Sequence, residues 1–129
     1  MGLSAEQIKF YREQYERLWP YLQSAMLTYG ETHSKDDLWN MVQSGHAQLW
    51  PMNNAAMLLT IEEYPSGLKE ANVWLAGGDI DEIRQWEPVI EDFCKSQGCT
   101  RSVIKGRRGW LRALKGYREV ATIMIKDFV

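Results

Sequence analysis

Two short apolar segments, residues 73–76 and 102–104, enclose a helical pattern, and this arrangement limits the folds open to the chain. The pattern begins with acids in residues 79–82, repeats its apolar positions every three or four residues, and ends at Gly98. Two strands joined by a helix become parallel neighbours, because a crossover brings the second strand back in the same direction. Such crossovers are right-handed in nearly all proteins. The sequence therefore predicts one parallel pair of strands.

Short apolar or alternating runs precede the crossover, at residues 47–50, 55–62 and 71–76. Turn-forming residues separate them at 53–54 and 65–67, which is typical of an antiparallel meander. After the crossover we expect a helical turn or two at residues 109–114. A last strand is expected at residues 117–125, where Val120, Thr122, Ile123 and Met124 form a β-prone run.

The first 45 residues have a helical pattern. Ser4 and Gln7 have the spacing of a capping box, and apolar residues then recur at helical spacing. Pro20 should kink or end this helix near Trp19, with a second piece reaching Gly30. Ser34 caps a further short helix that Gly45 ends.

These elements predict an α/β (α+β) fold with a mixed, mostly antiparallel sheet. We expect a single domain over residues 1–129, with a helical part at 1–45 and the sheet and crossover helix at 46–129. A chain of 129 residues that is 45% hydrophobic can build a core without disulfides or a metal. Cys94 and Cys99 fit neither a disulfide framework nor a zinc knuckle, so we expect reduced thiols.

No apolar run is long enough to span a membrane, and the first ten residues lack the pattern of a signal peptide. We therefore expect a cytoplasmic protein with no membrane partner. His33 and His46 have no Cys or Asp at ligand spacing, so no metal site is predicted.

The charges of the chain are unevenly distributed. Residues 101–118 contain seven basic residues and no acid, whereas the remainder holds 8 of the 15 basic residues and all 17 acidic ones, a balance of −9. This basic segment admits three interpretations. It is a solvated surface, a site that docks on an acidic protein, or a contact for nucleic acid or for the 3′-phosphate of coenzyme A.

The second half of the chain resembles the GCN5-related N-acetyltransferase (GNAT) family. The resemblance covers roughly residues 39–128 and depends on the order of elements, a helix closing on Gly98, and the pair Gly116-Tyr117 after a short helix. The segments 74–79 and 106–110 also look like those of small GNAT-like proteins encoded in phage and prophage genomes. The resemblance implies a GNAT-like sheet with acetyl-CoA held where the two parallel strands separate.

The resemblance places the pyrophosphate of acetyl-CoA at the start of the crossover helix, where free N–H groups favour an anion. Gly77 and Gly78 are the candidate phosphate turn, and Arg107 and Arg108 are candidate contacts for the cofactor. The basic or amide residue and the spacing of the family pattern are missing. The acids of residues 79–82 occupy the turn instead, so the turn is either a degenerate phosphate site or an ordinary strand-to-helix turn.

The catalytic positions also depart from the family. Family members use a tyrosine four residues before the Gly of the Gly-Phe or Gly-Tyr pair to protonate the thiolate, and Arg112 stands at that position. A guanidinium does not give up its proton at ordinary pH, so Arg112 is expected to be structural or partner-binding. The remaining weak candidates are Tyr117 as a phenol and a glutamate as general base. The glutamates near the strand ends are Glu62, Glu63 and Glu70.

These departures predict a GNAT-like phage or prophage accessory or virion-associated protein that acts mainly by binding a protein, such as a phage structural or host protein. Its location would be the host cytoplasm or the virion. The alternatives are an active acyl-CoA-dependent N-acyltransferase of a protein or small amine, and an assembly module that joins copies of itself into a homo-oligomer. Nucleic acid is the less favoured partner, because the net charge is only −2 overall.

Overall fold

The computed structural model describes residues 2–106 and 109–129 of the chain. It begins with two helices, α1 (Ala5–Tyr29) and α2 (Lys35–Ser44). Both start in a capping box, since the Ser4 and Ser34 hydroxyls accept bonds from the backbone N–H groups of Gln7 and Asp37. Gly45 ends α2 in the left-handed conformation, with φ of 85°.

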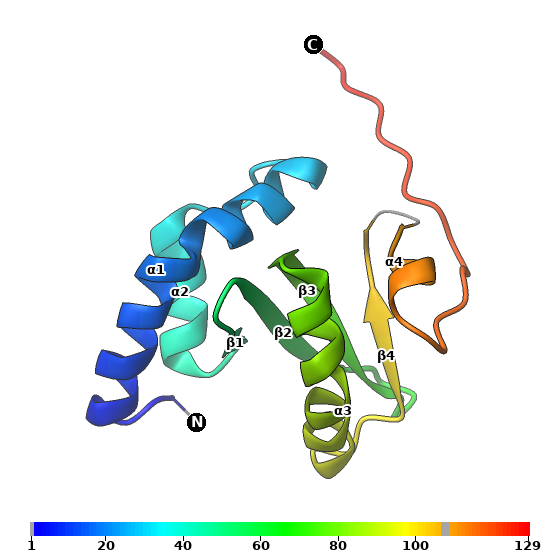
Figure 1. Cartoon of the computed structure of the whole chain (residues 1–129). Coiled ribbons are helices and arrows are strands. Elements are labelled where there is room, and N and C mark those ends of the chain that lie inside the picture. The colour runs from blue at the N-terminus through cyan, green and yellow to red at the C-terminus, as the bar shows by residue number, and fades with distance from the viewer. Residues whose placement is uncertain (1, 107–108) are drawn as a thin grey trace.

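Pro20 lies inside α1 and does not end it. The helix continues to Tyr29, and Figure 1 shows that its second part turns away from the direction of the first. Proline lacks the N–H that would bond to the carbonyl four residues earlier, which accounts for a bend. Of the two outcomes expected from the sequence, a kink or an end, the continuous helix excludes the second.

In the described part of the chain, four strands form one sheet in the order β1-β2-β3-β4. The bounds are β1 (Gln48–Pro51), β2 (Ala55–Glu63), β3 (Lys69–Gly78) and β4 (Arg101–Ile104). The first three strands pair antiparallel, whereas β3 and β4 pair parallel across the crossover helix α3 (Ile80–Ser96). The predicted meander and the parallel pair are both confirmed.

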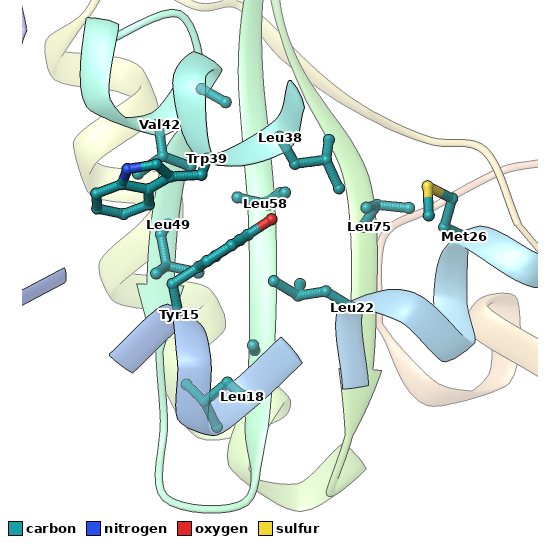
Figure 2. Close-up of a cluster of buried hydrophobic side chains, with 12 residues drawn as sticks. Tyr15, Leu18, Leu22, Met26, Leu38, Trp39, Val42, Leu49, Leu58 and Leu75 are labelled. Atoms are coloured by element: carbon teal, nitrogen blue, oxygen red, sulfur yellow. The ribbon is translucent and has the colours of Figure 1, made fainter. Parts of the chain in front are cut away.

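Helices cover both faces of the sheet and enclose two separate hydrophobic clusters (Figure 1). Figure 2 shows Tyr15 and Leu22 of α1 extending toward Leu58 of β2, and Leu18 and Leu75 belong to the same cluster. The second cluster lies on the face that α3 covers, and it includes the strand residues Ala55, Met57, Leu59, Ala71 and Val73. Six consecutive residues of β2 are buried, because each face of this strand meets one of the two clusters.

The expected last strand, at residues 117–125, is wrong. The short helix α4 (Gly109–Ala113) is followed by an extended segment that joins no ladder and leaves the body of the molecule (Figure 1). A β-prone sequence forms a strand only where a neighbouring strand satisfies its backbone, and this segment has no such neighbour in its own chain among the described residues. No helix in the described residues is long and apolar enough to cross a membrane.

Candidate functional site

The two parallel strands pair over a short length and then part. Glu70 to Val73 of β3 oppose Arg101 to Ile104 of β4, and β3 then continues to Gly78 with β2 as its only partner among the described residues. Helix α3 begins two residues later. We call this region, between residues 74–78 of β3 and the chain that follows β4, the β3–β4 divergence. It is the candidate site because the N-terminus of α3, whose free N–H groups favour an anion, lies directly beside it.

Close packing accounts for both glycines of the candidate phosphate turn. A Cβ on Gly77 would lie 2.5 Å from the backbone carbonyl oxygen of Tyr21 in α1. Gly78 has φ of +103°, and a Cβ there would lie 2.3 Å from the carbonyl oxygen of Asn54. The structure therefore requires glycine at both positions for contact with α1 and β2, whether or not a phosphate approaches.

Three carboxylates occupy the first turn of α3, and each makes an interaction of its own. Asp79 caps the helix, with its Oδ1 accepting from the N–H of Asp81 at 2.8 Å. Glu82 turns back toward the β1–β2 turn, where its Oε1 accepts from the N–H of Asn54 at 2.8 Å. Asp81 forms an ion pair with Arg84 at 3.2 Å. The positive end of the helix is thus already opposed by negative charge from the chain itself.

The described chain that follows β4 borders the divergence opposite β3 and carries part of the basic segment. Lys105 and Arg112 are exposed there, and Trp110 covers Gly106 closely enough that a Cβ on this glycine would lie 2.8 Å from the indole ring. Arg84 of α3 holds α4 in place by donating to the carbonyl of Ala113 at 2.7 Å. Arg107 and Arg108, the candidate cofactor contacts, lie outside the described residues.

The candidate glutamates lie far from the start of α3. Glu70 of β3 lies seven residues before Gly77 along the strand, and Glu62 of β2 is its direct neighbour across the ladder. At roughly 3.3 Å per residue, this separation is about 23 Å. Glu62 and Glu63 are exposed at the end of β2.

Glu70 is buried and has a structural partner. Its Oε1 accepts from Arg101 Nη2 at 2.8 Å and from Nε at 3.1 Å, so the pair joins β3 to β4. Residues 70 and 101 are directly opposed in the parallel register. Sequence reasoning missed this partnership because it depends on the register of a pair separated by 31 residues.

Tyr117 is half-buried against the second hydrophobic cluster. Its hydroxyl bonds to Ser102 Oγ of β4 at 2.8 Å, and burial raises the pKa of the phenol. A phenol with a raised pKa stays protonated at neutral pH and can act as a donor. Nothing in the sequence marked Ser102 as the partner of Tyr117. The hydrogen bond forms because Ser102 lies opposite Ala71, on the face of the sheet that carries the second hydrophobic cluster.

A small cavity of about 230 Å³ lies between α1, the β1–β2 turn and the first turns of α3, and sequence reasoning missed it. Phe10, Arg17 and Trp86 contribute to its lining, together with Glu82. Arg17 donates to the carbonyl groups of Met52 and Asn53 at 2.7 and 2.6 Å. Its guanidinium therefore fastens α1 to the β1–β2 turn.

The fold is that of known acetyltransferases. The chain is similar to an aminoglycoside acetyltransferase from an uncultured soil metagenomic sample, solved in complex with sisomicin, with a TM-score of 0.63 at 11% identity over 100% of this chain and 94% of that one. The same enzyme in complex with trehalose gives a TM-score of 0.62. The ribosomal-protein-alanine N-acetyltransferase of Brucella melitensis biovar Abortus 2308 gives 0.57 at 13% identity, over 90% of this chain and 94% of that one.

Comparison with protein-family models and with curated proteins found no match. At 11–13% identity the structural likeness establishes the GNAT-like fold, which the predicted element order had indicated, and leaves the chemistry to the residues of this chain.

Proposed function

We propose that this chain is a single GNAT-like domain over residues 1–129 that acts mainly by binding a protein partner and lacks a standard acetyl-CoA site. The observation that carries the proposal is the start of α3, where Asp79, Asp81 and Glu82 stand where a pyrophosphate would be held. A phage or prophage accessory or virion-associated role, in the host cytoplasm or the virion, fits the compact form of the domain. The basic segment 101–118 is the surface we assign to an acidic protein partner.

The repulsion can be estimated from the charges. Two unit charges about 4 Å apart interact by about 1 kcal/mol in water and about 4 kcal/mol at the effective dielectric of a protein surface. One unfavourable carboxylate thus weakens binding of a pyrophosphate by roughly fivefold to several hundredfold. We expect acetyl-CoA to bind with a dissociation constant in the high micromolar range or above at physiological salt.

Calorimetric titration with acetyl-CoA tests this expectation. The informative variant is Asp79→Asn, Asp81→Asn, Glu82→Gln, which removes three charges while the new amide oxygens can still accept from the N–H groups of Asp81 and Asn54. Asp92→Asn is the matched control, because Asp92 is an exposed acid later in the same helix. The triple variant should bind acetyl-CoA more tightly, and the control should not.

Two results would overturn the proposal. Low-micromolar binding by the unmodified protein would show that the carboxylates do not exclude the cofactor. Unchanged affinity in a folded triple variant would show that the phosphates lie elsewhere.

The second candidate is an active acyl-CoA-dependent N-acyltransferase of a protein or small amine, which the acetyltransferase names of the structural neighbours favour. The transfer would break the thioester C–S bond, form an amide C–N bond and move one proton from the amine to the thiolate. Glu62, Glu63 and Glu70 remain the weak candidates for the base, and Tyr117 for the acid. Release of free thiol from acetyl-CoA in the presence of sisomicin or a peptide with N-terminal alanine would support this function, provided that Tyr117→Phe reduces it.

A further inference from the structure

The last described segment of the chain exposes an unusual amount of apolar surface. Val120, Met124 and Phe128 are 73%, 88% and 90% exposed, and Ile123 and Ile125 are also exposed. Five apolar side chains exposed within nine residues are more than a protein surface usually carries in one segment, and such exposure indicates contact with another molecule. None of these side chains belongs to either hydrophobic cluster of the described residues.

The pattern of this segment is that of a strand inside a sheet. Successive side chains of a strand point to opposite faces. Val120, Thr122 and Met124 would form one face, and residues 121, 123 and 125 (Ala, Ile and Ile) the other. Both faces are largely apolar, which is typical of a strand covered on both sides.

The sheet has a free edge that such a strand would complete. β4 is the last strand in the sheet order and pairs only with β3 within the described residues. Its outward backbone groups form a template for a further strand. Among its described residues the chain therefore contains both an edge strand with no neighbour on its outer side, β4, and a β-prone segment without a partner strand, but the two do not pair within one copy.

The route of the chain favours a second copy as the occupant of the edge. Tyr117 is held at Ser102, close to the start of β4, and Figure 1 shows β4 and the segment after Tyr117 running toward the same end of the molecule. Pairing within one copy would thus be parallel. A segment from a second copy can pair antiparallel, which is the more stable arrangement per residue.

We propose that residues 118–129 of one copy pair with the β4 edge of a second copy, and that the exchange is reciprocal. Each copy gives one strand and receives one, so the contact is two-fold symmetric and closes at two copies. The interaction does not depend on the start of α3 and is independent of acetyl-CoA.

The first test measures mass in solution. Analytical ultracentrifugation from about 1 to 100 µM should show a species of twice the 15.0 kDa chain mass. Ile123→Glu should weaken dimerisation by about tenfold or more, because a charge would enter the covered strand. Val89→Glu is the matched control, since Val89 is 50% exposed on α3 and Ile123 is 51% exposed.

The second test identifies the paired segments. Protein with Val103→Cys is mixed with protein carrying Ile123→Cys and treated with a short bis-maleimide; the native Cys94 and Cys99 are buried. We expect a cross-linked species of two chains. A monomer throughout the concentration range, a dimer that Ile123→Glu leaves unchanged, or the absence of a cross-link between the two variant chains would each overturn the proposal.

Discussion

Glu70 shows how a residue suited to catalysis can have a structural role. Its side chain is 6% exposed and bonds to Arg101, whose side chain is 52% exposed. Water therefore screens the guanidinium of this ion pair and barely reaches the carboxylate. The pair fixes the register between β3 and β4, at the end of the ladder away from the divergence.

Replacement of Glu70 tests that role. We expect Glu70→Gln to lower the free energy of unfolding by about 1–3 kcal/mol, because a charge-assisted hydrogen bond is lost in a buried place. Glu62→Gln, on the exposed neighbouring position of β2, should change it by less than about 0.5 kcal/mol. Urea unfolding of both variants measures the difference, and equal small effects would contradict the structural role.

Cys94 gives a prediction about pH. Burial, with smaller effects from Cys99 and Glu91, raises the pKa of the Cys94 thiol to about 11. The folded protein therefore keeps this proton at a pH where the unfolded chain, with an ordinary thiol pKa of about 8.5, has released it. Since the unfolded state then binds fewer protons, the free energy of unfolding should fall as pH rises from about 9 to about 11.

Urea midpoints at pH 8 and pH 10 measure this dependence. Part of the fall should disappear in Cys94→Ala, which has no thiol at this position. An identical pH dependence in the two proteins would rule out a contribution from Cys94.

At the scale of elements, the contact between α1 and the end of β3 depends on Gly77. A methyl group there would meet the Tyr21 carbonyl, which belongs to helix backbone and cannot rotate away. We expect Gly77→Ala to lower the free energy of unfolding by about 1–3 kcal/mol. Gly109→Ala in α4, where a Cβ meets nothing within 4 Å, should be neutral or slightly stabilising.

Thermal melting compares these two alanine variants, and acetyl-CoA titration adds a second readout. If Gly77 instead serves the approach of a phosphate, Gly77→Ala would leave the melting temperature unchanged and weaken cofactor binding. That outcome would contradict the packing role.

Elements whose signals are local could be predicted from the sequence. Ser4 and Ser34 cap helices at the expected residues, and Gly45 ends α2. Pro20 alone did not determine whether the helix bends or ends. The helix stays continuous because Leu18 and Leu22, on either side of the bend, both pack in the first hydrophobic cluster. Local propensity alone does not include that tertiary contribution.

For the whole molecule, the sequence predicted the order of strands and the parallel crossover, because apolar period and turn residues determine both. It failed at residues 117–125, where the β-prone pattern is clear but the neighbouring strand is missing from the described part of the same copy. The acids at the start of α3 were found in advance. The partners of Glu70 and Tyr117 were not, because they depend on which residues of β4 face which side.

The parallel pair also has a consequence for the kinetics of folding. Glu70 and Arg101 are separated by 31 residues of chain, whereas Glu63 and Lys69 are joined by a short turn. Because closing the longer loop costs more conformational entropy, β4 can pair with β3 only after α3 has formed and brought the two strands together. We expect β4 to join the sheet last and to detach first, while the α1–α2 side stays folded. Native-state hydrogen exchange on the Ile123→Glu variant should then show the amide of Thr100, which bonds to Lys69, exchanging well before the amides in the middle of β2. Equal protection of the two would mean that the sheet opens as one unit; early exchange would mean that β4 leaves the sheet transiently in a protein that is otherwise intact, so that the wall of the candidate site opposite β3 is in motion.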